Sequence, residues 1–249
     1  MMKITETVKQ LLIINVIFFL GAQFVPAMDE YLALFYFENP YFQYWQILTH
    51  MFMHGSWMHL FFNMFALYSF GSALEHFWGS KKFLFFYISC GLGAALLHSG
   101  VNYYLVHQGI STLVENGFDQ QHILATLAEG KYDSRWAQFL SNDGLQSMLS
   151  SYNTRAVGAS GAIYGLLVAF AFMFPNAELA LMFIPVPIKA KYFVPGILVM
   201  DLYLGLNGGS IFGGSTGIAH FAHIGGAVIG FLMMWYWKKN QFEQNRWDR

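Results

Sequence analysis

Long apolar stretches separated by short polar segments dominate the chain. A helix needs about 20 mostly apolar residues to cross a lipid bilayer. Six stretches approach that length, near residues 11–28, 58–77, 83–106, 156–175, 192–206 and 218–237. The fifth is the weakest, because it is short and carries Asp201. The pattern predicts an all-α membrane protein with six transmembrane helices.

The first apolar stretch has a second interpretation. Lys3 and Lys9 precede it, as basic residues precede the apolar part of a signal peptide. No clear cleavage site of small residues follows it, so we expect a retained helix.

The positive charges divide unevenly between the two sides of a six-helix topology. An even number of spans places both termini on one side, and 10 of the 13 Lys and Arg residues then share it. Positive charge marks the cytoplasmic side, so we expect both termini in the cytoplasm. No Arg-rich transit segment begins the chain, which favours a bacterial plasma (inner) membrane. The ten residues are Lys3, Lys9, Lys81, Lys82, Lys189, Lys191, Lys238, Lys239, Arg246 and Arg249.

Composition agrees with a membrane protein. Charged residues make up 11% of the chain and mean hydropathy is +0.41, whereas soluble domains carry about 25% charged residues. The net charge of −1 offers no basic surface for nucleic acid. Cys90 is the single cysteine, so no intramolecular disulfide can form, and we expect it to be a packing residue.

We expect one membrane domain, residues 1–249, without internal repeats. Residues 29–57 are dense in aromatic side chains, which suit a loop at the membrane interface. Residues 107–155 form a polar extramembrane insertion between the third and fourth spans. It should contain helical turns near 121–129 and 136–140, and a surface-packed segment is favoured over a gate. Glycines predict a mobile loop over 205–217, and residues 238–249 form a cytoplasmic tail.

Three polar clusters interrupt the apolar stretches. His59 and Asn63 are four residues apart and share a helix face. Ser160 opens the fourth span, where backbone N–H groups lack intrahelical partners. His220 and His223 open the sixth, and all three clusters fall near the same, non-cytoplasmic depth. Polar groups in a span tend to face the protein interior or a water-filled cavity.

Together these residues supply what acyl transfer requires. Serine becomes a nucleophile when a base accepts its proton, and histidine suits that role near neutral pH. His59, Asn63 and the backbone N–H of Ser160 could stabilise the oxyanion. Taken alone, each cluster also fits hydrogen bonding between helices.

A metal site is the weaker interpretation of the histidines. His50, His54 and His59 are spaced by four and five residues, but no H-E-x-x-H motif occurs and no carboxylate within the spans lies near them. We therefore expect no metal and no cofactor. The choice between His220 and His223 as base stays open on these grounds.

The three clusters, read in order, resemble the rhomboid family of intramembrane serine proteases. The resemblance rests on His59-Leu-Phe-Phe-Asn63, Gly158-Ala-Ser-Gly161 and His223-Ile-Gly-Gly-Ala-Val-Ile-Gly230, and it covers nearly the whole chain. It implies a six-transmembrane-helix rhomboid-like bundle and a Ser160–His223 catalytic dyad with no third acidic member. His223 is favoured over His220 because it keeps the motif's spacing to Gly226 and Gly230.

The resemblance also assigns supporting roles. His59 and Asn63 correspond to the oxyanion-stabilising pair, and Tyr164 to a tyrosine that packs against the base and orients it. Gly226 and Gly230 would bring the sixth helix close to the fourth, near Gly161 and Gly165.

Three residues of the interface loop also match the family. His50 and His54 correspond to loop-supporting histidines. Trp45 is followed by Gln46, where many family members have arginine, so bracing of the loop by arginine is in doubt. Asp201 has no counterpart in the motifs. We expect it to hydrogen-bond between helices, with substrate gating as the weaker alternative.

The implied function is that of a serine endopeptidase cleaving peptide bonds in or near transmembrane segments. Its partners would be transmembrane protein substrates and the lipid bilayer, and the sequence sets no oligomeric state. Two alternatives belong to other classes: a non-catalytic rhomboid-fold protein that binds membrane clients, and a small transporter with a histidine-lined proton path. The first usually lacks the serine or the base, and this chain has both.

Overall fold

The computed structural model describes residues 3–181, 184–207 and 218–244. Its helices and strands are, in chain order, α1 (Glu6–Phe24), α2 (Ala27–Leu32), α3 (Gln46–Thr49), η1 (His50–Phe52), α4 (Trp57–Ala66), η2 (Leu67–Gly71), α5 (Ser72–Trp78), α6 (Ser80–Glu115), α7 (Gln120–Ala128), η3 (Ser134–Gln138), α8 (Asn142–Asn153), α9 (Ser160–Met173), β1 (Glu178–Leu181), β2 (Ile184–Lys189), α10 (Ala190–Leu206) and α11 (Ile218–Gln244). Six helical segments therefore lie where the apolar stretches predict them.

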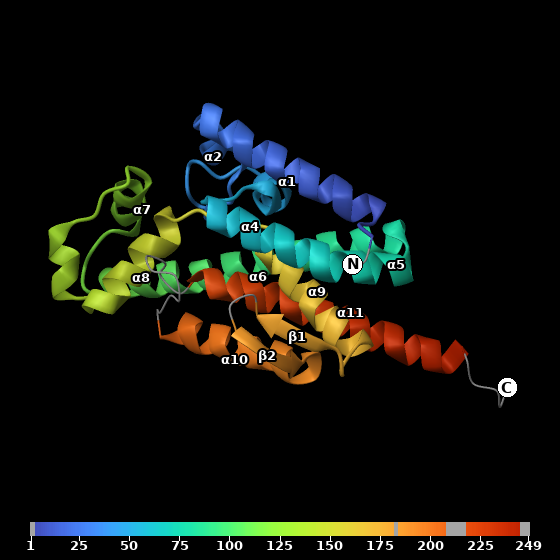
Figure 1. The fold of residues 1–249 in the computed structure, drawn as a ribbon. Coiled ribbons are helices and arrows are strands. Elements are labelled where there is room, and N and C mark those ends of the chain that lie inside the picture. Colours follow the sequence, from blue (N-terminus) through green and yellow to red (C-terminus); the bar gives the residue numbers. More distant parts are fainter. Residues whose placement is uncertain (1–2, 182–183, 208–217, 245–249) are drawn as a thin grey trace.

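Helices α6, α9 and α11 pack against one another at the centre of the bundle. Helix α10 lies against α9 and α11 on one side, and α1 lies beyond α4 on the other (Figure 1). By length and hydropathy alone, among the described residues, α1 and α6 are sufficient to cross a membrane, and α9 is a shorter apolar helix.

The second predicted span is not one regular helix. It is built from α4, the π-helical segment η2 and α5, which follow one another without a break. A π-helical turn is a local departure from the i→i−4 ladder that hydropathy does not encode. The span predicted over 58–77 is therefore present as a continuous helical segment with an irregular middle.

Helix α6 is longer than the sequence analysis expected. Its 36 residues span about 54 Å at 1.5 Å per residue, whereas the hydrocarbon core of a bilayer is about 30 Å thick. The excess length carries α6 into the insertion, where α8 packs along it.

Glycine allows the central helices to approach each other closely. A Cβ atom on Gly226 of α11 would lie 1.8 Å from the carbonyl oxygen of Gly161 in α9, and one on Gly230 would lie 2.8 Å from the Cα of Gly165. A Cβ on Gly165 would lie 2.3 Å from the sulfur of Cys90 in α6, which is fully buried. These small residues determine the spacing of α6, α9 and α11.

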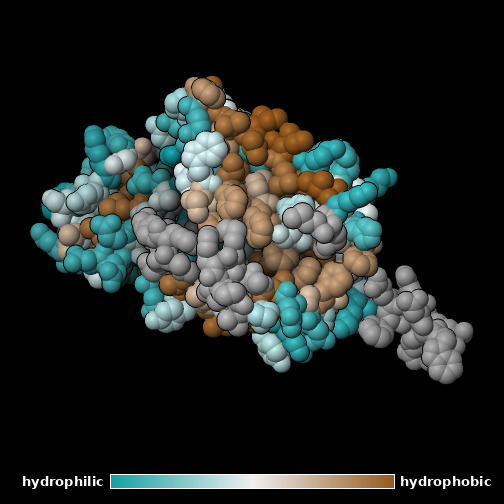
Figure 2. Space-filling model, viewed as in Figure 1, coloured by the Kyte–Doolittle hydropathy of each residue, from teal (hydrophilic) through white to brown (hydrophobic). Residues whose placement is uncertain are grey.

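The two ends of the bundle differ. The start of α1 and the end of α11 lie at one end, and α7 and α8 lie at the other (Figure 1). Hydrophobic residues gather over α1 and the middle of the molecule, while hydrophilic residues gather over the insertion and towards the opposite end (Figure 2). This banding is the arrangement expected of a protein that spans a bilayer.

The insertion is folded rather than extended. Trp136, Met148 and Tyr152 are fully or almost fully buried in a cluster that also includes Leu113 of α6 and Tyr36 of the interface loop. The expected turns appear as α7 and η3, but α8 was not predicted. Two hydrogen bonds tie α8 to the interface loop: the amide of Asn39 donates to the Tyr152 carbonyl (2.9 Å), and the Tyr152 hydroxyl donates to the Glu38 carbonyl (3.0 Å).

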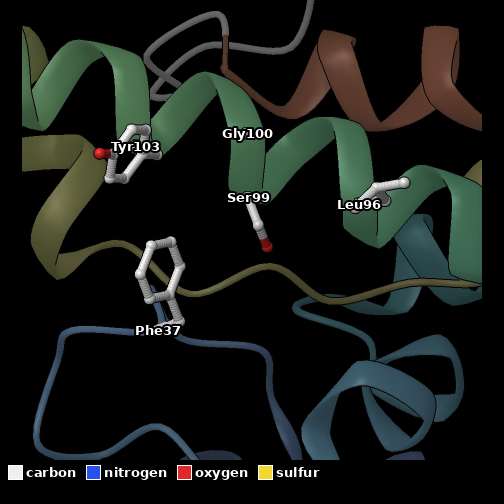
Figure 3. A pocket seen from close by; sticks show the side chains of 5 residues that line it. All are labelled: Phe37, Leu96, Ser99, Gly100 and Tyr103. Carbon is white, nitrogen blue, oxygen red and sulfur yellow. The ribbon is translucent and has the colours of Figure 1, made fainter.

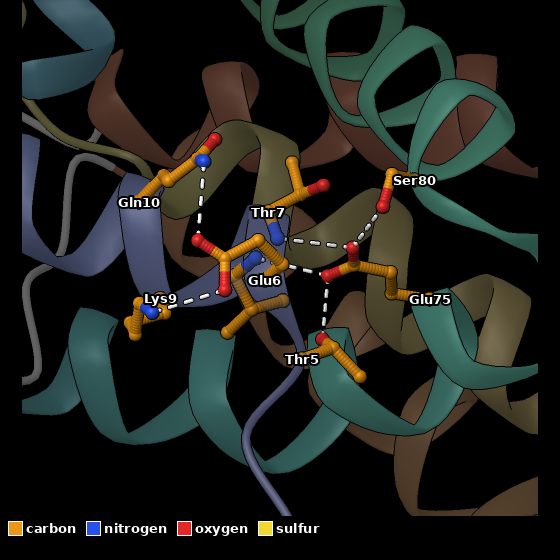
Figure 4. Close-up of polar contacts among 8 residues, drawn as sticks. Thr5, Glu6, Thr7, Lys9, Gln10, Glu75 and Ser80 are labelled. Atoms are coloured by element: carbon orange, nitrogen blue, oxygen red, sulfur yellow. Dashed lines mark hydrogen bonds and ion pairs between the residues drawn. The ribbon is translucent and has the colours of Figure 1, made fainter.

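A carboxylate anchors the start of α1. Glu75 accepts hydrogen bonds from the backbone N–H groups of Thr7 (3.0 Å) and Val8 (2.9 Å) and from the hydroxyl groups of Thr5 and Ser80 (Figure 4). The first N–H groups of a helix have no intrahelical partners, so Glu75 caps α1 from a neighbouring helix and ties it to α5 and α6.

Two further segments differ from the sequence analysis. Strands β1 and β2 form an antiparallel hairpin between α9 and α10, where no strand was predicted. The predicted mobile loop over 205–217 falls mostly outside the described residues, and its first two positions belong to α10.

Candidate active site

Ser160 is the first residue of α9, and the backbone ahead of it is shaped by Gly158. Gly158 has φ +123°, a conformation that residues with a side chain rarely adopt, and its N–H donates to the His50 carbonyl (2.9 Å). The first intrahelical bond of α9 runs from Ile163 to Ala159. The N–H groups of residues 160–162 therefore lie ahead of the ladder and are free to face an anion.

His223 lies directly against Ser160. Its Nε2 is 2.9 Å from the Ser160 Oγ, although the two residues are 63 positions apart in the sequence. The ring stacks on Tyr164 with a centroid separation of 4.2 Å and an interplanar angle of 8°. Tyr164 follows Ser160 by one helical turn, so α9 supplies both the partner hydroxyl and the surface that orients the imidazole.

His220 occupies a different place. Its Nδ1 hydrogen-bonds to the carboxylate of Asp201 in α10. Asp201 also lies 3.4 Å from His223 Nδ1, measured to the same Oδ1. The sequence analysis left Asp201 between helix bonding and gating, and the structure brings its carboxylate to both imidazoles. The sequence shows a carboxylate in the middle of an apolar helix, which indicates a buried partner. The identity of that partner depends on how the helices pack.

His59 and Asn63 face the same region from α4. Ser56 caps this helix by accepting from the His59 N–H (3.1 Å). The Gly55 N–H donates to His59 Nδ1 (3.4 Å), which assigns the proton of a neutral ring to Nε2. A Cβ on Gly158 would lie 2.8 Å from that Nε2 and 3.6 Å from Ser160 Oγ, so the imidazole borders the serine.

Asn63 is buried on the same helix as His59. Its amide donates one hydrogen bond to the His59 carbonyl (2.8 Å). An amide NH₂ group carries two donors, so this bond uses one of the two N–H groups.

The interface loop is braced by Gln46 in the place of an arginine. Gln46 is fully buried; it accepts from the N–H groups of Phe35 (3.3 Å) and Gln43 (3.1 Å) and donates to the Glu30 (3.1 Å) and Tyr41 (3.0 Å) carbonyls. Four bonds from one neutral side chain hold the loop, so arginine is not required for bracing.

Of the other predicted loop residues, Trp45 and His50 are hydrogen-bonded, whereas both ring nitrogens of the buried His54 lack a hydrogen-bond partner among the described residues. Trp45 Nε1 donates to the Tyr31 carbonyl (2.8 Å), and His50 Nδ1 bonds to the Gln46 carbonyl (3.0 Å). The ring of His54 packs edge-on against His59 with centroids 5.0 Å apart. Burial lowers the pKa of His54 to about 3, so this ring is neutral near pH 7 and adds no charge beside His59.

Most of the chain matches the sequence model of a known protein family. A sequence model of the Rhomboid domain matches residues 41–117 and 134–240. The chain belongs to the rhomboid family. Its fold is accordingly an all-α rhomboid bundle, and the rhomboid chain is a membrane protein.

Curated relatives come from bacteria and mitochondria. "Rhomboid protease AarA" of Providencia stuartii is 28% identical over 76% of this chain and 54% of that protein. "Rhomboid protein 1, mitochondrial" of Saccharomyces cerevisiae is 25% identical over 78% of this chain and 42% of that protein. "Presenilin-associated rhomboid-like protein, mitochondrial" of Homo sapiens is 26% identical over 85% of this chain and 42% of that protein.

The matches cover only part of each relative, and they come from more than one kind of membrane. The rhomboid chain spans about half the length of the curated relatives it matches, or somewhat less. Mitochondrial relatives stand beside the bacterial one, so the comparisons support a membrane location but not the bacterial plasma membrane expected from the sequence.

An apolar cavity lies apart from this site. It has a volume of about 410 Å³ and is lined by Phe37 of the interface loop and by Leu96, Ser99, Gly100 and Tyr103 of α6 (Figure 3). None of the polar residues predicted for catalysis lines it. The candidate active site is therefore defined by its side-chain geometry and not by this cavity.

One group among the described residues has the composition of a metal site. One ligand atom each from Asp201, His220 and His223 lie within 4.8 Å of one another. This group includes His223, whose Nε2 contacts Ser160. A metal ion bound here would therefore have to use Nδ1 of His223 to leave that contact intact.

Proposed function

We propose that the chain is a serine endopeptidase that hydrolyses peptide bonds in or near transmembrane segments of other membrane proteins. The observation that supports this most directly is the 2.9 Å contact between Ser160 Oγ and His223 Nε2, with the imidazole stacked on Tyr164. Membership of a family that includes a named rhomboid protease agrees with it.

In the first half of the reaction, Ser160 Oγ attacks the carbonyl carbon of the scissile bond while His223 Nε2 takes its proton. The resulting oxyanion is stabilised by His59 Nε2–H, the Asn63 amide and the free N–H groups at the start of α9. Each such donor contributes on the order of 10²–10³ in rate. The intermediate collapses when the imidazolium gives its proton to the leaving amine, which leaves an ester on Ser160.

The second half regenerates the enzyme. His223 removes a proton from a water molecule that attacks the ester carbonyl, and the same donors hold the second oxyanion. Collapse breaks the bond to Oγ, returns the proton to Ser160 and releases the new carboxyl terminus. No metal or redox cofactor takes part in these steps.

The substrate must unwind locally before it reacts. A carbonyl within a helix is hydrogen-bonded and shielded by the turns around it, so attack requires an extended segment at the site. Small residues at the scissile bond are expected from the resemblance to the rhomboid family.

The distribution of charge supports an orientation in the membrane. In a six-span topology, 10 of the 13 Lys and Arg residues of the sequence fall at the same end as both termini. By the positive-inside rule, this end would face the cytoplasm of a bacterium or the corresponding compartment of an organelle.

The test is active-site labelling of the purified protein with a fluorescent fluorophosphonate. Labelling should be strong in the wild type and be lost in Ser160→Ala and His223→Ala. It should remain detectable at a reduced rate in His220→Ala, because His220 does not contact Ser160 but bonds to the carboxylate beside His223. Cleavage of a model transmembrane substrate in liposomes should be lost in the same two variants and remain detectable in His220→Ala. A folded wild type that neither labels nor cleaves would contradict the proposal and favour a rhomboid-fold protein that binds clients without cutting them.

A further inference from the structure

Asp201 is an acidic side chain buried within the bundle. Its exposed fraction is 4%, and that of His220 beside it is 8%. An ionisable group inside a membrane-spanning helix is costly unless it is paired. The pairing partners here are two imidazoles of α11, one of which is the candidate base.

His223 uses its two nitrogens in opposite directions. Nε2 faces Ser160 Oγ at 2.9 Å, and Nδ1 faces Asp201 Oδ1 at 3.4 Å. In a neutral imidazole one nitrogen donates and the other accepts. A carboxylate at Nδ1 accepts only, so it holds the proton there and leaves the lone pair of Nε2 directed at the serine.

We propose that Asp201 is a positioning residue, which holds His223 in the tautomer that can accept the proton of Ser160 and stabilises the imidazolium that follows. The inference rests on the proposed protease function and departs from the dyad without an acidic member that the family resemblance implies. The proton transfer itself remains between Ser160 and His223, and Asp201 stays ionised throughout.

His220 holds the carboxylate in place. Its Nδ1 donates to Oδ1, the oxygen that also faces His223. Oδ2 has no hydrogen-bond partner among the described residues within the usual distance. The side chain of Tyr164 also interacts with Asp201, so His220 and Tyr164 together constrain the orientation of the carboxylate. The separation of 3.4 Å from His223 is long for a hydrogen bond, but catalytic hydrogen bonds are often long without substrate and shorten when charge develops.

The charge environment of His223 is defined by few groups. Ser160 and Tyr164 face it from α9, Asp201 from α10, and His220 from its own helix, while His59 of α4 interacts with it across the site. Asp201 is the one acidic group in this set. Removing its charge should therefore change the pH dependence of the reaction as well as its rate.

The experiment compares Asp201→Asn and Asp201→Glu with the wild type on a model transmembrane substrate in liposomes, between about pH 5 and pH 9. In enzymes with a complete triad the Asp→Asn change lowers kcat by about 10⁴-fold, and the longer distance here predicts about 10²-fold. KM should stay within about threefold, because the change acts on the chemical step. The acidic limb of the kcat/KM profile should move to lower pH, and Asp201→Glu should recover part of kcat.

Asp143→Asn is the matched control, because Asp143 is an exposed acidic residue at the start of α8 in the insertion. It should leave kcat and the pH profile unchanged. Thermal unfolding of each variant in detergent separates a loss of chemistry from a loss of fold.

Three outcomes would overturn the inference. Folded Asp201→Asn with the kcat and pH profile of the wild type would show that the carboxylate does not act on His223. A lower kcat with an unchanged pH profile and reduced thermal stability would make Asp201 a structural brace. Loss of wild-type activity in EDTA, restored by Zn²⁺, would make the three residues a metal site. If the folded wild type is itself inactive, the proposed protease function is contradicted, and this result can be told apart from the three outcomes above.

Discussion

Gly158 combines an unusual backbone conformation with a close contact. Its φ of +123° disfavours any side chain, and a Cβ there would lie 2.8 Å from the Cε1 and Nε2 atoms of His59. Gly158→Ala should therefore displace His59 from Ser160 and lower the fluorophosphonate labelling rate by at least about tenfold, the strained backbone alone costing about 1–3 kcal/mol.

Gly117→Ala is the matched control for that change. Gly117 also has positive φ (+90°), but nothing lies within 4 Å of its Cβ position. It should lose some thermal stability and keep the wild-type labelling rate. Equal labelling rates in the two variants would show that the contact with His59 has no role.

The candidate site was largely predictable at the level of residue identity. Ser160 and His59 were singled out as polar residues within apolar stretches, and Tyr164 by the family resemblance. The structure brings all three to His223. The partnership of Asp201 was not predictable, because it depends on the rotation of α10 against α11. Hydropathy gives the depth of a side chain in the membrane but not the neighbour that it faces.

At the scale of elements, the contact between α9 and α11 depends on glycine. A Cβ on Gly226 would overlap the Gly161 carbonyl at 1.8 Å, so Gly226→Ala must force the helices apart. Overpacking of this kind typically costs about 1–3 kcal/mol, and it would also lengthen the distance from His223 to Ser160. Labelling should fall more than about tenfold and the melting temperature should drop.

Gly100→Ala provides the comparison, since nothing lies within 4 Å of a Cβ at this position in α6. Alanine favours helix over glycine by about 1 kcal/mol, so this variant should be as stable as the wild type or more so. If Gly226→Ala labelled as fast as Gly100→Ala, close packing would not be required for the site.

The anchoring of α1 by Glu75 leads to a second prediction at this scale. Glu75→Ala would leave the N–H groups of Thr7 and Val8 without their acceptor, and hydrogen bonds to charged groups contribute about 1.5–3 kcal/mol each. The variant should melt at a clearly lower temperature in detergent. Glu6→Gln is the control, because Glu6 is exposed and, among the described residues, its carboxylate bonds to the neighbouring side chains of Lys9 and Gln10. Similar melting of both variants would contradict the anchoring role.

Elements were predicted well where hydropathy is high and less well elsewhere. The six apolar stretches correspond to helical segments, because burial in lipid and in the bundle selects the same residues. Helix α8 was missed although Leu145, Met148 and Tyr152 are spaced by three and four residues, a pattern typical of one buried helix face. The π-helical segment and the hairpin depend on tertiary packing, which the sequence pattern does not reveal.

At the scale of the whole molecule, the insertion and the interface loop pack against each other. Tyr36 of the loop is buried among residues of the insertion, and Asn39 bonds to α8. His50 of the same loop accepts from the Gly158 N–H beside Ser160. Packing in the insertion can therefore influence the geometry of the site through the loop.

The arrangement of the two ends gives a prediction for membrane topology. Cys90 is the single cysteine and is fully buried, so an introduced cysteine can be labelled without background. Lys131 is exposed in the insertion and Lys81 is exposed near the start of α6, at the opposite end. In sealed, uniformly oriented vesicles, a membrane-impermeant maleimide should label only one of Lys131→Cys and Lys81→Cys until detergent is added. The wild type should stay unlabelled, and labelling of both variants in intact vesicles would contradict a bundle that spans the bilayer with its two ends on opposite sides.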